Sequence, residues 1–151
     1  MEEEQFMIVR IGNKPYGIKI KDVKEVVPNT EITSVPDKES IYICGVIECR
    51  YGCVSVFDIY RLFGINPFHA NKGMMIILAF DGKLLVFSSE QVDGVVSVSH
   101  EKIYDIPSML NNASQRYMKK IIVLDNHLVP IIDTAHLFEK TDALEEAELI
   151  S

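Results

Sequence analysis

The sequence has few of the features that mark membrane-spanning or exported proteins. Its longest uninterrupted apolar run, residues 74–80, is far shorter than the ~20 residues that a transmembrane helix requires. The first residues, MEEEQ, are acidic and lack the basic and apolar regions of a secretory signal. Cysteine is scarce and odd in number, with three residues. We therefore expect a cytoplasmic protein with free thiols, without membrane insertion.

Positive charge is also in deficit. The 15 lysine and arginine residues face 22 aspartate and glutamate residues, which gives a formal net charge of -7 and a pI of about 5.1. This balance argues against nucleic acid or an anionic membrane surface as the main partner. Tryptophan is absent and no strand combines basic with aromatic residues, which disfavours a nucleic-acid-binding barrel.

Catalytic and metal-binding patterns are missing as well. Cys44, Cys49 and Cys53 are separated by four and three residues, whereas a zinc site favours paired Cys-x-x-Cys spacing and a fourth ligand. Buried or half-buried thiols are the better interpretation. Asp58 and Asp133 stand at equivalent points of a repeat, so helix N-capping explains them better than a catalytic carboxylate pair. The histidines fit no catalytic or metal motif: His69, His100, His127 and His136. We therefore predict no catalytic residues, metal or cofactor.

The residues that are present predict a mainly β protein. The 48% hydrophobic fraction can fill a core. Alternating and continuous apolar segments bounded by turn residues are typical of strands. Strands are predicted over residues 6–11, 16–20, 43–47, 53–57, 74–80, 84–88, 92–98, 121–124 and 128–132, with a turn or bulge at Asp93-Gly94. Residues 22–28 are predicted as a short turn that ends at Pro28, and residues 141–150 as a C-terminal helix.

One segment, residues 43–64, combines a hairpin with a short helical turn. Gly52 suits the hairpin turn. Asp58 suits a helix N-cap, and Gly64 suits the residue that follows a helix end. Arg50 lies at the hairpin tip, where a structural core has no use for it.

The two halves of the chain repeat the same order of elements. Residues 54–58 match residues 129–133 at an offset of 75, residues 23–27 match 92–96 at an offset of 69, and residues 35–36 match 106–107 at 71. We therefore expect one domain, residues 1–151, built from two homologous β subdomains at about 5–65 and 72–138. Each has roughly five strands, enough to close a small barrel. The tip is not repeated: Arg50 aligns with Asp125, and Tyr51 with Asn126.

These residues resemble a CheW-type chemotaxis adaptor over residues 6–138. The family pattern Gly-Val-hydrophobic-Asn-Leu-Arg-Gly stands here as GVIECRY, and the following strand stands as GCVSVFDI. YGI at 16–18, VKEV at 23–26 and ITSVP at 32–36 also fit the family. The chain departs from the pattern at several positions: Glu48 for Asn, Tyr51 for Gly, Ser55 for Pro, Lys120 for Gly, and SEQV at 89–92 for Val-Asp-x-Val.

The resemblance implies two packed five-stranded barrels with short capping helices and a non-enzymatic scaffold role. Such adaptors couple membrane chemoreceptors to a CheA-type histidine kinase. The receptor tip binds in the groove between the barrels, and the kinase regulatory domain docks on a separate face. The implied localisation is cytoplasmic, with recruitment to receptor arrays. The positions matched to partner binding are Val23, Glu25 and Arg50, those matched to the groove are Met74, Leu85 and Val86, and the altered tip adds Tyr51.

Other functions stay open on the residues. The same groove would serve an adaptor for another signalling or motility system. A small metal-binding protein or enzyme is less favoured, because no reactive pattern stands out.

Overall fold

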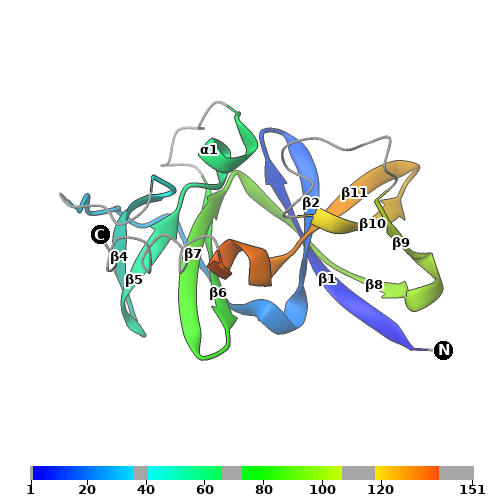
Figure 1. Ribbon diagram of the computed structural model, residues 1–151, viewed down its shortest axis with the longest axis horizontal. Helices are drawn as coiled ribbons and strands as arrows, with labels where there is room; N and C mark the ends of the chain where they lie inside the picture. The colour runs from blue at the N-terminus through cyan, green and yellow to red at the C-terminus, as the bar shows by residue number, and fades with distance from the viewer. Residues whose placement is uncertain (1, 36–40, 66–72, 107–117, 140–151) are drawn as a thin grey trace.

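The computed structural model describes residues 2–35, 41–65, 73–106 and 118–139, and these residues are mostly strand. They form a six-stranded and a five-stranded sheet, which lie side by side along the long axis of the molecule (Figure 1). The mainly β prediction is confirmed. Within the described ranges, no helix is long and apolar enough to cross a membrane. The predicted helix at 141–150 lies outside the described residues.

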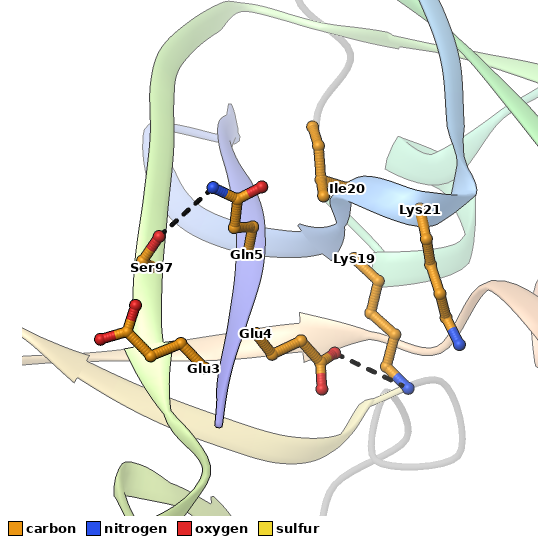
Figure 2. A pocket seen from close by; sticks show the side chains of 7 residues that line it. All are labelled: Glu3, Glu4, Gln5, Lys19, Ile20, Lys21 and Ser97. Carbon is orange, nitrogen blue, oxygen red and sulfur yellow. Dashed lines mark hydrogen bonds and ion pairs between the residues drawn. The ribbon is translucent and has the colours of Figure 1, made fainter. Parts of the chain in front are cut away.

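The six-stranded sheet has the order β8-β1-β2-β11-β10-β9. Its neighbours are antiparallel except for β11 and β2, which run parallel with Ile131 opposite Gly17. Gln5 on β1 donates a hydrogen bond to the Ser97 hydroxyl on β8, which joins two strands far apart in the chain (Figure 2). The strands are β1 (Glu3–Ile11), β2 (Lys14–Lys19), β8 (Gln91–Ser99), β9 (Ile103–Asp105), β10 (Met118–Leu124) and β11 (His127–Ile132).

The five-stranded sheet has the order β3-β6-β7-β5-β4. Its one parallel pair among the described strands is β5 and β7, with Val56 opposite Val86. The strands are β3 (Val23–Pro28), β4 (Ile43–Cys49), β5 (Gly52–Phe57), β6 (Met74–Phe80) and β7 (Lys83–Ser89). Short helical segments lie between the strands: η1 (Ile20–Asp22), α1 (Ile59–Phe63) and η3 (His100–Lys102). A further helical segment, residues 134–139, follows β11.

The register of the sheets follows the sequence repeat. Val56 opposite Val86 in one sheet corresponds to Ile131 opposite Gly17 in the other, at the offsets of 75 and 69 found in the sequence. Each sheet nevertheless takes strands from both halves of the chain. The β1–β2 hairpin lies with the strands after residue 90, and the β6–β7 hairpin lies with β3, β4 and β5. The proposed division at 5–65 and 72–138 therefore follows the repeat along the chain and not the membership of the sheets.

Residues 22–28 differ from their prediction. They do not form a short turn: Val23–Pro28 is strand β3, paired antiparallel with β6. Its β-branched valines suit a strand, and Pro28 stands at the strand end, where a missing N–H is tolerated. The bulge predicted near Asp93 is present, because Ile8 lies opposite Gly94 while Val9 lies opposite Val92.

Local capping around α1 agrees with the sequence. The Asp58 side chain accepts a hydrogen bond from the Arg61 amide at 3.1 Å. Gly64 ends the helix in the left-handed conformation, with φ of 67°, which residues with a side chain rarely adopt.

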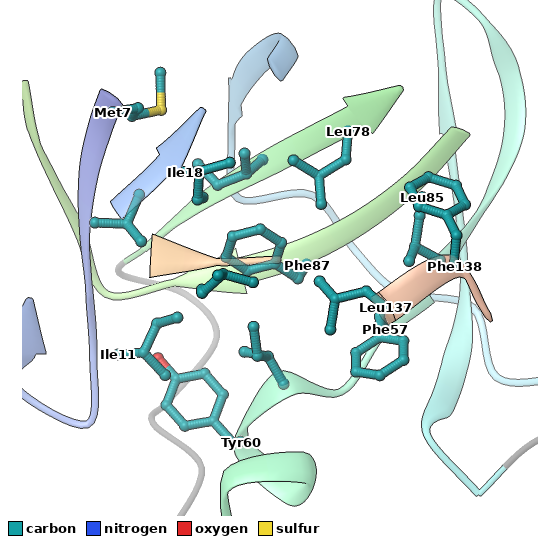
Figure 3. Packing of buried hydrophobic residues seen from close by; sticks show 14 of the residues in the cluster. Met7, Ile11, Ile18, Phe57, Tyr60, Leu78, Leu85, Phe87, Leu137 and Phe138 are labelled. Carbon is teal, nitrogen blue, oxygen red and sulfur yellow. The ribbon is translucent and has the colours of Figure 1, made fainter. Parts of the chain in front are cut away.

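Among the described residues, three clusters of buried side chains stabilise the two sheets. Two of them each use strands of a single sheet, one around Phe6 and Ile122 and the other around Ile47 and Val86. Each sheet therefore curves around an interior of its own, as a small barrel does. The third cluster draws on both sheets and on α1, and Phe87 lies in its middle (Figure 3). This shared core fixes the two sheets relative to each other.

Glu90, next to strand β7, fastens the β1–β2 turn. Its carboxylate accepts hydrogen bonds from the Gly12 amide at 2.5 Å and the Asn13 amide at 3.0 Å. The Tyr60 hydroxyl donates to the same carboxylate at 3.3 Å. Burial, together with the charge of Glu90, raises the pKa of Tyr60, so this phenol stays protonated as a donor.

Replacing Glu90 with glutamine should lower the free energy of unfolding by about 1–2 kcal/mol. The change removes the charge that strengthens these hydrogen bonds and directs an NH2 group toward donors. Urea denaturation measures the effect, and Glu101→Gln on η3 is the exposed control. Equal midpoints for the wild type and Glu90→Gln would refute this role.

Candidate functional site

The tip of the β4–β5 hairpin meets strand β3. Arg50 Nη2 lies 3.1 Å from Glu25 Oε1, and the Arg50 side chain is 72% exposed against 23% for Glu25. Strands β3 and β4 are the two outer strands of the five-stranded sheet. The ion pair therefore spans from one edge of this sheet to the other. Thr33 and Val46 add a backbone bridge to the β4 edge, with hydrogen bonds of 2.8 and 2.9 Å.

Tyr51 completes this group of side chains. The Lys24 ammonium lies 5.3 Å from the centre of the Tyr51 ring, within the range of a cation–π contact. Desolvation of the phenol raises the pKa of Tyr51, and its hydrogen bond to Glu25 and the charge of Glu25 act in the same direction. Tyr51 therefore stays neutral and orders the tip between one acid and two cations. We call Lys24, Glu25, Arg50 and Tyr51 the tip cluster.

The tip cluster has no counterpart in the second half. At the offsets of the repeat, its four positions are occupied by Asp93, Gly94, Asp125 and Asn126. The six-stranded sheet forms without these side chains, so the fold does not require them. An exposed ion pair of this kind contributes only about 0–1 kcal/mol to stability, which favours a role in recognition.

The other predicted site residues lie deeper. Val23 and Met74 are half-buried at the ends of β3 and β6, and Val23 packs against the shared core. Leu85 and Val86 are 3% and 0% exposed. Both faces of β7 are covered, because Leu85 faces the shared core and Val86 faces the interior of its own sheet. These two residues therefore do not line a groove surface in this structure, contrary to their expected placement.

Two of the three cysteines are half-buried, as expected, whereas the third is exposed and departs from that expectation. Cys44 and Cys49 are half-buried, with their thiols 3.5 Å from the carbonyls of Val56 and Gly52, and Cys53 is exposed. Within the part of the chain that the structure describes, no group of three His, Cys, Asp or Glu residues could hold a metal ion.

Comparison with known proteins assigns the fold to a family. The sequence-family model described as the CheW-like domain matches residues 5–142 of this chain. The chain belongs to the CheW-like domain family. It is 22% identical over 142 residues to the probable chemotaxis protein CheW of Rhizobium etli, covering 93% of this chain and 91% of the relative. It is 24% identical over 138 residues to the chemotaxis protein CheW of Bacillus subtilis, covering 91% and 88%.

A solved structure agrees with the two-sheet fold of this CheW-like domain. The scaffolding protein TtCheW from Thermoanaerobacter tengcongensis superposes with a TM-score of 0.78 at 23% identity, covering 89% of this chain and 86% of that one. The resemblance inferred from the sequence and its CheW-like fold class are therefore confirmed.

One member of the tip cluster, Lys24, was not among the site residues predicted from the sequence. In this CheW-like domain the register between β3 and β6 shifts between Val23 and Glu25, which leaves Lys24 without a partner on β6. Such a bulge re-aims a side chain, and here Lys24 reaches Tyr51. The equivalent bulge in the second half falls at Asp93, which pairs with Arg10 at 2.9 Å. The sequence did contain a signal for this bulge. At the offset of 69, Lys24 corresponds to Asp93, where a turn or bulge was predicted.

Proposed function

We propose that this CheW-like protein is a non-enzymatic adaptor that couples membrane chemoreceptors to a CheA-type histidine kinase. The observation that carries this proposal is a tip cluster that the repeated fold does not need, on the scaffold of a family whose curated relatives are chemotaxis proteins. The adaptor would act in the cytoplasm, at receptor arrays, through binding alone.

The tip cluster suits recognition by charge. Glu25 contacts one nitrogen of the Arg50 guanidinium, and the side chain stays 72% exposed. A planar guanidinium offers several donors in a fixed arrangement, which matches a carboxylate on a partner. Because Glu25 and Tyr51 hold the tip before binding, less side-chain entropy is lost on docking. We assign this face to the kinase regulatory domain, with orientation set by charge complementarity.

The receptor would bind as a helix against apolar surface between the two sheets. Val23 and Met74 are half-buried and contribute to this surface, whereas Leu85 and Val86 support it from below. Each interface can be weak, because many copies in an array bind together and raise the overall affinity.

Tyr51 favours a second candidate function, in which the protein is an adaptor for a different signalling or motility system. This residue fills the tip position where the family pattern has glycine, and it contacts Lys24. A changed tip would suit a different signalling or motility kinase on the same fold.

The test is a calorimetric titration with the regulatory domain of the CheA-type kinase from the same organism, and separately with a receptor cytoplasmic fragment. We expect saturable binding in both titrations. The kinase without its regulatory domain is the control and should not bind. Binding to neither partner, or equal binding to the truncated kinase, would refute the adaptor role.

A further inference from the structure

A basic cavity lies away from the tip cluster, where the two sheets meet. Its volume is about 250 Å³, slightly below the ~300 Å³ at which common ligand pockets begin. It is bounded by the end of β2, by η1, by the end of β6, by β10 and by the segment that follows β11. Four lysines and two aspartates supply its charge: Lys19, Lys21, Lys119, Lys120, Asp22 and Asp133.

The cations of this cavity are only partly neutralised. Lys120 is closely paired with Asp105. Lys19 Nζ lies 3.9 Å from Glu4, and Lys119 Nζ lies 3.9 Å from Asp133, both at the outer limit of an ion pair. Lys21 has no ion pair with any residue in the described ranges. Figure 2 shows the Lys19 and Lys21 side chains extending in the same direction. This cluster of positive charge stands out in a chain with a net charge of -7.

A buried hydroxyl in the cavity wall provides independent evidence for a ligand. Thr134 lines the cavity and is 3% exposed. Its Oγ1 has no hydrogen-bond partner among the described residues. A buried polar group without a partner costs about 1–3 kcal/mol, so native proteins rarely retain one without a use.

The cavity chemistry is specific to one half of the molecule. At the offset of 75, the positions of Lys119, Lys120 and Thr134 correspond to Cys44, Gly45 and Ile59. The other sheet therefore forms the same fold without these polar groups. The basic cavity is an addition to the repeat, as the tip cluster is.

We propose that this cavity binds a small phosphate-type oxyanion, either inorganic phosphate or the phosphoryl group of a small metabolite. Lysine ammonium groups bind phosphate as point charges, and the Thr134 hydroxyl can donate one hydrogen bond to a phosphate oxygen. The size of the cavity admits a small group, and the unpaired Lys21 together with the weakly paired Lys19 and Lys119 supplies positive charge for an anion. The site contains no residue of the tip cluster.

The test is an amide NMR titration of the full chain with inorganic phosphate at constant ionic strength. We expect saturable shifts at Lys21, Lys119 and Thr134. The double variant Lys21→Ala/Lys119→Ala should weaken binding at least about tenfold, because two charges are lost. Thr134→Val should weaken binding about threefold or more through loss of one donor.

Two controls separate binding from folding. Lys102→Ala on η3 lies outside the cavity and should leave phosphate binding unchanged. Thr134→Val should keep or raise the melting temperature without phosphate, since the hydroxyl it removes has no partner. A second arm compares phosphoserine with phosphate, and tighter phosphoserine binding identifies a carried phosphoryl group as the ligand. Shifts that do not saturate, shifts that chloride reproduces, or an equal loss in Lys102→Ala would overturn the proposal.

Discussion

Replacing Arg50 with alanine is expected to weaken binding of the kinase regulatory domain at least about tenfold while leaving the fold intact. Residues that anchor an interface commonly contribute about 2 kcal/mol or more, and arginine is prominent among them. The side chain is 72% exposed, so its loss removes little packing. The exposed pair with Glu25 accounts for about 0–1 kcal/mol of stability. Calorimetry measures the affinity, and urea denaturation measures the free energy of unfolding.

Two variants make the Arg50 experiment specific. Arg61→Ala removes an exposed arginine on helix α1, which follows β5 at the end opposite the tip, and should leave kinase binding unchanged. Arg50→Lys keeps the charge but loses the planar arrangement of donors, so it should bind with intermediate affinity. If Arg50→Ala binds the kinase domain and the receptor fragment as the wild type does, the role assigned to Arg50 is wrong.

Local features of this fold were predictable from the sequence because their chemistry is local. The cap at Asp58 and the helix end at Gly64 depend on residues within one turn, and both are present. The repeat offsets found in the sequence also agree with the structure, because equivalent strands of the two sheets form equivalent pairs.

The exchange of hairpins between the sheets was not predictable. Strand β7 pairs with β5 in parallel, about 30 residues along the chain, and β2 pairs with β11 more than 110 residues away. An apolar strand can pair with any apolar strand of matching length, so the apolar sequence pattern does not determine which two strands pair. Strand β3 was missed because Asp22 and Pro28 are helix and turn signals, although the valines between them have high strand propensity.

The candidate site could be proposed from the sequence where the chain departs from its own repeat. Arg50 stood out because its counterpart is Asp125 and no core needs it. Leu85 and Val86 were expected to line the groove because they align with groove positions of the family, and such an alignment carries no information about burial. The continuous apolar run LLVF at 84–87 was itself a sign that both faces of the strand are covered.

The close approach of residues 32–33 to strand β4 depends on Gly45, and Gly45→Ala is expected to lower the free energy of unfolding by about 2–3 kcal/mol. A Cβ at this position would overlap the backbone carbonyl oxygen of Thr33 and lie 2.7 Å from Ile32 Cγ2. The Thr33 backbone cannot withdraw freely, because it exchanges two hydrogen bonds with Val46. The added methyl group must therefore either break those hydrogen bonds or displace strand β4, and each is unfavourable. Urea denaturation at constant pH measures the loss.

The repeat supplies a matched control for Gly45. Its counterpart at the offset of 75 is Lys120, where the backbone already carries a side chain and pairs with Asp105 on β9. Lys120→Ala should therefore change the free energy of unfolding by less than about 1 kcal/mol. Because β4 leads directly to the tip, Gly45→Ala should also displace Arg50 from Glu25 and weaken kinase binding in the fraction that remains folded. Equal stability of Gly45→Ala and Lys120→Ala would show that the bridge between Thr33 and Val46 does not limit how closely residues 32–33 approach strand β4.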